Sequence, residues 1–291
     1  MPKALFEGCA VALITPFKGD EIDWKALDHL VDFQLEMETD AIVACGTTGE
    51  PSTMTDQEWE KTLTRVIERV QGRVPVIAGT GGNCTADVMK KAAIARTLGA
   101  DAQLCVTPYY NKTTQAGLIA HYTAIAEDSI LPVILYNVPA RTGLNMLPET
   151  LAALAGHENV IAMKEASGNM AQIMEMMRLC GDQIAFYSGS DELTVPFRAM
   201  GGKGVISVAA NVAPKMMKDL CSLPLEQAAK LNLEMLPFIN ALFTEVNPIP
   251  VKAAAGIMGL CKNELRLPLV PLSPANEEKV RNEMKKAGLI C

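Results

Sequence analysis

Lys164 is the residue of this chain with the clearest chemical potential, because it ends the apolar run Val160–Lys164, which predicts a short buried strand. Lysine is rarely buried without a partner, and burial would lower its pKa below the free value of about 10.4. A neutral lysine amine can attack a ketone or aldehyde and form an imine. The run alone also allows a strand-end lysine whose flexible stem reaches solvent.

Side chains that could assist such a nucleophile follow other apolar runs. Thr47 and Thr48 stand between two glycines, whose backbone amides can form a carboxylate-binding nest. Tyr136 ends a run and is a candidate proton shuttle, and the planar fork of Arg141 suits a second carboxylate. Taken singly, these residues could form a turn, a packed phenol and a surface charge. Together they predict a keto acid held by its carboxylate while its ketone condenses with Lys164.

Eight short apolar runs provide the elements that would position these groups. They show little polar alternation, which is typical of parallel strands covered on both faces. The runs are Cys9–Ile14, Asp40–Cys45, Val74–Ala78, Ala102–Val106, Pro132–Tyr136, Val160–Lys164, Ile184–Tyr187 and Gly204–Val208.

Segments with helical spacing and start signals lie between the runs. The signals are Asp23 as a cap, Thr55 with Glu58 as a capping box, Thr85 as the cap of a helix that ends at Gly99, and Pro148 in a first turn. Strands alternating with helices predict an α/β fold, a (β/α)₈ barrel, over residues 1–224. In such a barrel reactive groups gather at the carboxyl ends of the strands, which favours a functional Lys164.

Residues 225–291 show helical patterns without strands and no linker before them, so they predict a helical layer packed on the barrel. Its expected helices are Leu225–Thr244, Pro248–Leu260 and Pro274–Ala287. A doubly wound open sheet is the alternative fold. It usually carries a nucleotide fingerprint, and Gly79–Cys84 has cysteine where that fingerprint requires its last glycine.

Composition narrows the class of protein. The 291 residues carry a net charge of -7, which argues against nucleic acid or an anionic membrane as a partner. The sequence has neither a long apolar stretch nor a signal-peptide pattern at its start, so we expect a cytoplasmic protein. Its eight cysteines and three histidines are scattered, and they predict no metal site. Imine chemistry needs neither a metal nor an organic cofactor.

Seven sequence blocks resemble one known family. The chain is similar to the dihydrodipicolinate synthase (4-hydroxy-tetrahydrodipicolinate synthase) family of the pyruvate-dependent class I aldolases, a superfamily that includes N-acetylneuraminate lyase. The resemblance runs nearly end to end, and the ordered set of blocks is more specific than any one of them. The blocks are Ala12–Phe17, Gly46–Glu50, Thr107–Asn111, Tyr136–Gly143, Met163–Gly168, Gly189–Asp191 and Asn247–Lys252.

This resemblance implies catalytic roles for four residues. Lys164 would form a Schiff base with pyruvate, and Tyr136 would transfer protons beside it. Thr47 would connect Tyr136 to Tyr110, which would enter the site from a neighbouring subunit. The implied assembly is therefore a homotetramer, built as a dimer of dimers.

The resemblance also implies how the substrates are held. Thr48 would bind the pyruvate carboxylate, and Arg141 would bind the carboxylate of L-aspartate 4-semialdehyde. Gly189 and Ile206 would line the pocket. The implied reaction is a condensation in lysine and diaminopimelate biosynthesis.

Two other functions stay open from the sequence. One is a class I aldolase or lyase for a sugar-derived 2-keto acid, of the N-acetylneuraminate lyase or 2-keto-3-deoxygluconate aldolase type. The other is a catalytically silent ligand-binding barrel. The Arg141–Gly143 segment favours the synthase, because the sugar-acid lyases generally lack it, and the complete lysine, tyrosine and threonine set argues against a silent barrel.

Feedback by lysine is a feature of some members of the family. Asn83 and Tyr109 match the implied allosteric site, and Asp87 keeps the acidic character of its position. Asp56, Trp59 and Pro51 depart from the pattern of the lysine-sensitive members. We therefore expect weak or absent inhibition by lysine.

Overall fold

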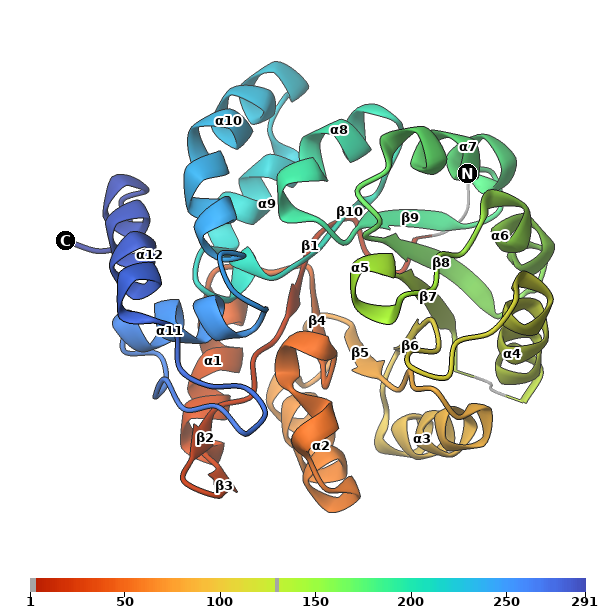
Figure 1. Ribbon diagram of the computed structural model, residues 1–291, viewed down its shortest axis with the longest axis horizontal. Helices are drawn as coiled ribbons and strands as arrows, with labels where there is room; N and C mark the ends of the chain where they lie inside the picture. Colours follow the sequence, from red (N-terminus) through yellow and green to blue (C-terminus); the bar gives the residue numbers. More distant parts are fainter. Residues whose placement is uncertain (1–3, 129–130) are drawn as a thin grey trace.

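The computed structural model describes residues 4–128 and 131–291, and a closed barrel of eight parallel strands lies at its centre (Figure 1). Each strand falls on one of the eight predicted runs. Around the barrel the strands are β1 (Gly8–Ala12), β10 (Gly204–Ser207), β9 (Ala185–Ser188), β8 (Val160–Glu165), β7 (Val133–Asn137), β6 (Ala102–Val106), β5 (Val76–Gly79) and β4 (Ala41–Ala44). The barrel prediction is confirmed, and the open-sheet alternative is wrong.

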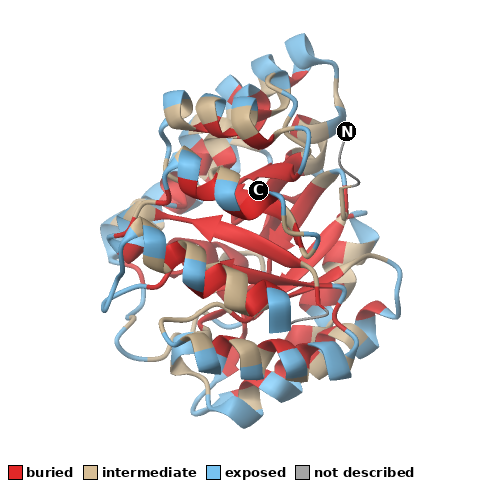
Figure 2. Ribbon diagram, turned by 90° about the vertical axis from the view of Figure 1, so that its right-hand side faces the viewer, coloured by how far each residue is buried: buried red, intermediate tan, exposed pale blue. Residues whose placement is uncertain are grey.

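Helices surround the barrel in the order expected of βα repeats (Figure 1). Figure 2 shows buried strands inside and helices that turn their exposed faces outward. The helices of this ring are α1 (Trp24–Glu36), α2 (Asp56–Val70), α3 (Thr85–Leu98), α4 (Gln115–Asp128), α6 (Pro148–Ala155), α7 (Met170–Cys180), α8 (Thr194–Ala199) and α9 (Pro214–Ser222). The short helix α5 (Pro139–Thr142) follows β7 and is drawn over the barrel in Figure 1, inside the ring. Four 3₁₀ turns interrupt the loops: η1 (Thr47–Gly49), η2 (Pro51–Thr53), η3 (Asp191–Leu193) and η4 (Ala209–Asn211).

Most of the predicted helix signals are confirmed. The Asp23 carboxylate accepts a hydrogen bond from the Ala26 amide (3.0 Å), and Thr55 and Glu58 form the reciprocal capping box at α2. Pro148 is the first residue of α6, and Gly99 follows α3 in the left-handed conformation.

The cap predicted at Thr85 is wrong. Thr85 is the first residue of α3, and Cys84 occupies the cap position without a side-chain bond. The Thr85 hydroxyl lies 2.9 Å from Nδ1 of His121 on α4 instead. A partner from the neighbouring helix has therefore replaced the local capping bond.

A two-stranded hairpin, β2 (Phe17–Lys18) and β3 (Glu21–Ile22), was not predicted. Each of its strands has two residues, too few to show a period. The buried Phe17 ring lies 4.1 Å from Nζ of Lys252, so the hairpin supports the C-terminal layer.

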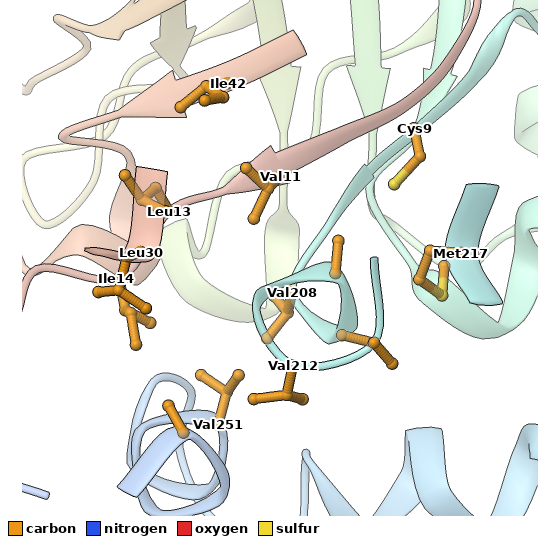
Figure 3. Close-up of a cluster of buried hydrophobic side chains, with 14 of the residues drawn as sticks. Cys9, Val11, Leu13, Ile14, Leu30, Ile42, Val208, Val212, Met217 and Val251 are labelled. Atoms are coloured by element: carbon orange, nitrogen blue, oxygen red, sulfur yellow. The ribbon is translucent and has the colours of Figure 1, made fainter. Parts of the chain in front are cut away.

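The C-terminal layer consists of α10 (Leu225–Ala241), α11 (Ile249–Ile257) and α12 (Pro274–Lys286), close to the predicted ranges. Figure 3 shows Val11 of β1, Val212 and Val251 of α11 in one cluster of buried side chains. The layer thus shares a hydrophobic core with the outer face of the barrel. Within the described residues, no helix combines the length and apolar character needed to cross a membrane.

Candidate active site

A cavity of about 300 Å³ opens at the carboxyl ends of the strands, where barrels carry their reactive groups. It brings together residues that are far apart in the sequence. Those predicted from the sequence are Thr47, Thr48, Tyr136, Arg141, Lys164 and Gly189.

Lys164 is buried, with 6% of its surface exposed. It pairs with Tyr136 across β7 and β8, and its Nζ lies 4.2 Å from the centroid of the Tyr136 ring. Burial lowers the pKa of Lys164 to about 8; nearby Asp191 acts in the opposite direction, and Arg141 lowers it further. The lysine that the sequence singled out therefore has an amine that is partly neutral near physiological pH.

Tyr136 responds to the same environment in the opposite way. Burial raises the pKa of its phenol to about 12, so the hydroxyl keeps its proton at neutral pH. The ring also presents its negative face to the lysine ammonium. A proton donor thus stands directly beside the nucleophile.

Gly189 leaves the space that the lysine side chain occupies. A Cβ at this position would lie 2.7 Å from Cβ of Ala166 and 3.0 Å from Cε of Lys164. Such contacts are too short for a larger residue without displacement of Lys164. Glycine is therefore required here by close approach.

Asn247 connects two of the predicted substrate-binding residues. Its Nδ2 donates to Oγ1 of the buried Thr48 (3.0 Å), and its carbonyl oxygen accepts from Nη2 of Arg141 (3.1 Å). The threonine from η1 and the arginine from α5 are thus held by one residue of the segment between α10 and α11. Asn247 lies in a sequence block that resembles the family, but the sequence alone predicts no role for it.

A buried ion pair fixes the loop that carries the two threonines. Nζ of Lys252 on α11 donates to Oε1 of Glu50, and both side chains are almost fully buried. Glu50 has a left-handed backbone, with φ of 56°. The pair ties the end of η1 to the C-terminal layer.

Two predicted residues lie elsewhere. Tyr110 is 90% exposed and has φ of 68°, and it does not line the cavity of its own chain. Ile206 is fully buried in the barrel interior. Among the described residues, Val208, two positions further on, lines the cavity in its place.

A second cavity of about 250 Å³ adjoins the first and shares Thr47, Tyr136 and Arg141 with it. Tyr109 and Pro51 line it, and Lys91 of α3 reaches into it over the ring of Trp59 (5.7 Å).

Some of the residues discussed for the implied allosteric site lie at this second cavity. Nδ2 of Asn83 donates to the Tyr109 carbonyl (3.3 Å), and the Trp59 indole donates to the Gly79 carbonyl (3.1 Å). Asp56 and Asp87 are exposed. The structure therefore brings Asn83 and Tyr109 together and leaves the two aspartates at the surface.

Three further residues line the first cavity, which we call the reaction cavity, and were not predicted from the sequence. They are Glu192 in η3, Asn240 near the end of α10 and Phe243 just after it. Glu192 directly follows the block Gly189–Asp191 that resembles the family. The other two lie in a segment whose only sequence signal was helical. Among the described residues, no group of three or more His, Cys, Asp or Glu side chains could hold a metal ion.

Comparison with known proteins gives consistent matches along the chain. The model of the dihydrodipicolinate synthetase family matches residues 5–287. The 4-hydroxy-tetrahydrodipicolinate synthase of Trichlorobacter lovleyi is 52% identical over 290 residues, covering 98% of this chain and all of the relative. The same enzyme of Geobacter sulfurreducens is also 52% identical, with the same coverage.

Solved structures agree with this result. The crystal structure of dihydrodipicolinate synthase from Thermotoga maritima has a TM-score of 0.97 at 45% identity, covering 99% of this chain and 100% of that one. The enzyme from Acinetobacter baumannii, solved with pyruvate, has a TM-score of 0.96 at 44% identity, covering 98% and 99%.

Proposed function

The chain belongs to the dihydrodipicolinate synthetase family, and we propose that it acts as a 4-hydroxy-tetrahydrodipicolinate synthase, a lyase of lysine and diaminopimelate biosynthesis. Its substrates are pyruvate and L-aspartate 4-semialdehyde. The observation that carries this proposal is the buried Lys164 amine, with its lowered pKa, beside the Tyr136 ring in the cavity at the barrel mouth.

The first half of the reaction takes place on pyruvate. The neutral Lys164 amine attacks the C2 carbonyl carbon, and loss of water gives an imine. A proton then leaves C3, and the resulting enamine is the carbon nucleophile. Tyr136 supplies and removes protons beside Lys164, in a relay with Thr47 and with Tyr110 from a second subunit.

The second half joins the two substrates. C3 of the enamine bonds to the aldehyde carbon, and the aldehyde oxygen takes a proton and becomes a hydroxyl group. The amino group of the second substrate then attacks C2, which closes the ring and releases the Lys164 amine. The covalent bond between Lys164 and C2 of pyruvate therefore forms and breaks within one turnover, and the new C–C and ring C–N bonds leave with the product.

Thr48 and Arg141, which Asn247 connects, each bind one of the two substrates. Thr48 holds the pyruvate carboxylate, and Arg141 holds the carboxylate of the aldehyde at the entrance. Gly189 keeps space for the imine, and Ile206 supports the cavity from the barrel interior. Residues 1–224 form the catalytic barrel, and residues 225–291 the layer that closes one side of its cavity.

Assembly follows the family resemblance, whereas regulation by lysine departs from the sensitive members. The exposed Tyr110 supports a dimer in which each subunit completes the site of the other. The homotetramer of two such dimers rests on the family resemblance. Inhibition by lysine is weak or absent, because Asp56, Trp59 and Pro51 depart from the lysine-sensitive pattern. The cytoplasmic location stays a prediction of the sequence.

Borohydride reduction in the presence of pyruvate, followed by peptide mass mapping, tests the mechanism. We expect a covalent label on Lys164 and condensation of pyruvate with L-aspartate 4-semialdehyde. A label on another residue, or robust cleavage of sialic acid or ketodeoxygluconate in parallel assays, would refute the proposal.

A further inference from the structure

We propose that Glu192 binds the α-ammonium group of the second substrate and so selects an amino aldehyde over aldehydes that lack the amine. The inference rests on the proposed function and deepens it. Three of the described residues that line the reaction cavity carry a charge: Arg141, Lys164 and Glu192. Glu192 is the acidic one.

The backbone around Glu192 is held from two sides. Its carbonyl oxygen accepts from Nδ2 of Asn232 on α10 (3.0 Å). The carboxylate of the preceding Asp191 accepts from the amides of Val208 (3.2 Å) and Ala209 (2.8 Å), beyond the end of β10. The half-buried Glu192 side chain thus starts from a fixed position on η3.

Charge complementarity identifies what this carboxylate would bind. The second substrate carries a carboxylate, an aldehyde and an ammonium group. Arg141 accounts for the carboxylate and the neutral Lys164 enamine for the aldehyde, but Arg141 carries a positive charge that would repel the ammonium group in a partly desolvated site. Glu192 supplies the opposite charge in the same cavity.

The neighbouring acidic residues are engaged elsewhere. Glu165 is buried and accepts from Nδ2 of Asn137 (2.9 Å) and from the amide of Ser167 (2.5 Å). Asp191 is buried against backbone amides. Neither lines the cavity, so Glu192 is the carboxylate available to a substrate.

The test compares the binding of two aldehydes to the full-length wild-type chain and to its Glu192→Gln variant. Succinic semialdehyde has the same carboxylate and aldehyde as the second substrate but lacks the amine. With pyruvate present, we expect E192Q to raise KM for L-aspartate 4-semialdehyde about tenfold, with kcat changed less, because one charge-assisted bond is lost. The inhibition constant of succinic semialdehyde should stay within about twofold of wild type.

Two further variants complete the design. Glu192→Asp keeps the charge on a shorter side chain and should recover part of the KM loss. Glu226→Gln removes an exposed carboxylate in the first turn of α10 and should leave both constants unchanged. Borohydride trapping of pyruvate reports on folding and on the imine in every variant.

The outcomes distinguish a failure of the role of Glu192 from a failure of the proposed function. An active wild type with an unchanged KM in E192Q, or an equal loss of affinity for both aldehydes, overturns the role of Glu192 alone. A wild type that traps pyruvate but does not condense L-aspartate 4-semialdehyde overturns the proposed function, and the inference falls with it.

Discussion

At the scale of single residues, burial separates the acid–base properties of two neighbours. The Lys164 amine has its pKa lowered to about 8, and the Tyr136 phenol has its pKa raised to about 12. The same low-polarity environment disfavours the charged form of each group. That form is the protonated ammonium for Lys164 and the deprotonated phenolate for Tyr136, so the two pKa values move in opposite directions. The amine of Lys164 is therefore partly neutral near neutral pH, while the Tyr136 phenol keeps its proton.

This separation predicts how imine formation depends on pH. With a pKa of about 8, roughly a tenth of Lys164 is neutral at pH 7, against roughly one part in three thousand for a free lysine. The rate of borohydride-trappable imine formation at limiting pyruvate should rise with pH and level off above about 8. A rate that still rises tenfold between pH 9 and 10 would show an unperturbed lysine.

The sequence predicts the nucleophile but not all of its partners. Lys164 stands out because a charge at the end of an apolar strand is unusual, and Tyr136 lies opposite it in the next strand. Glu192 and Asn247 were given no role because polar residues after a strand or between helices are common. Their importance comes from distant contacts, such as the one between Asn247 and Thr48, which local patterns do not encode.

At the scale of elements, the eight strands were predictable because each is covered on both faces and reads as a continuous apolar run. The hairpin β2–β3 was missed because its polar residues Lys18 and Glu21 break any apolar run. Thr85 was misassigned because His121, which binds it, lies on another helix. The barrel thus follows from local pattern, whereas its irregular parts depend on tertiary contacts.

The turn after β9 provides the next prediction. Gly189→Ala should reduce imine trapping at least about tenfold and destabilise the fold by about 1–3 kcal/mol, because the new methyl group would collide with Ala166 and Lys164. Trapping with pyruvate and urea unfolding measure the two effects. Gly156→Ala is the matched control, since a Cβ there meets nothing within 4 Å. Equal activity of the two variants would contradict this role of Gly189.

At the scale of the whole molecule, the buried pair of Glu50 and Lys252 couples the barrel to the C-terminal layer. Glu50→Gln should lower the free energy of unfolding by about 3–5 kcal/mol, because the Lys252 charge would remain buried without its partner. Urea unfolding of the full chain measures the loss. Glu175→Gln, which breaks an exposed pair with Arg178, should cost less than about 1 kcal/mol. Similar losses in both variants would remove the structural role of the buried pair.

Subunit mixing tests the proposed dimer. Lys164→Met and Tyr110→Phe should each be nearly inactive alone. After unfolding and refolding together, mixed dimers would contain one site with both residues intact, so activity should recover to about a quarter of wild type. No recovery, although mixed dimers form, would show that Tyr110 does not act across the interface.

The cavity wall formed by Asn240, Phe243 and Asn247 has a consequence for the life of the nascent chain. The nucleophile emerges from the ribosome well before the residues that enclose it and before Lys252, which anchors the threonine loop. Until that last part has been translated, Thr48 and Arg141 lack their shared partner. A truncated product would therefore carry Lys164, Thr48 and Arg141 without the residue that holds Thr48 and Arg141 in place.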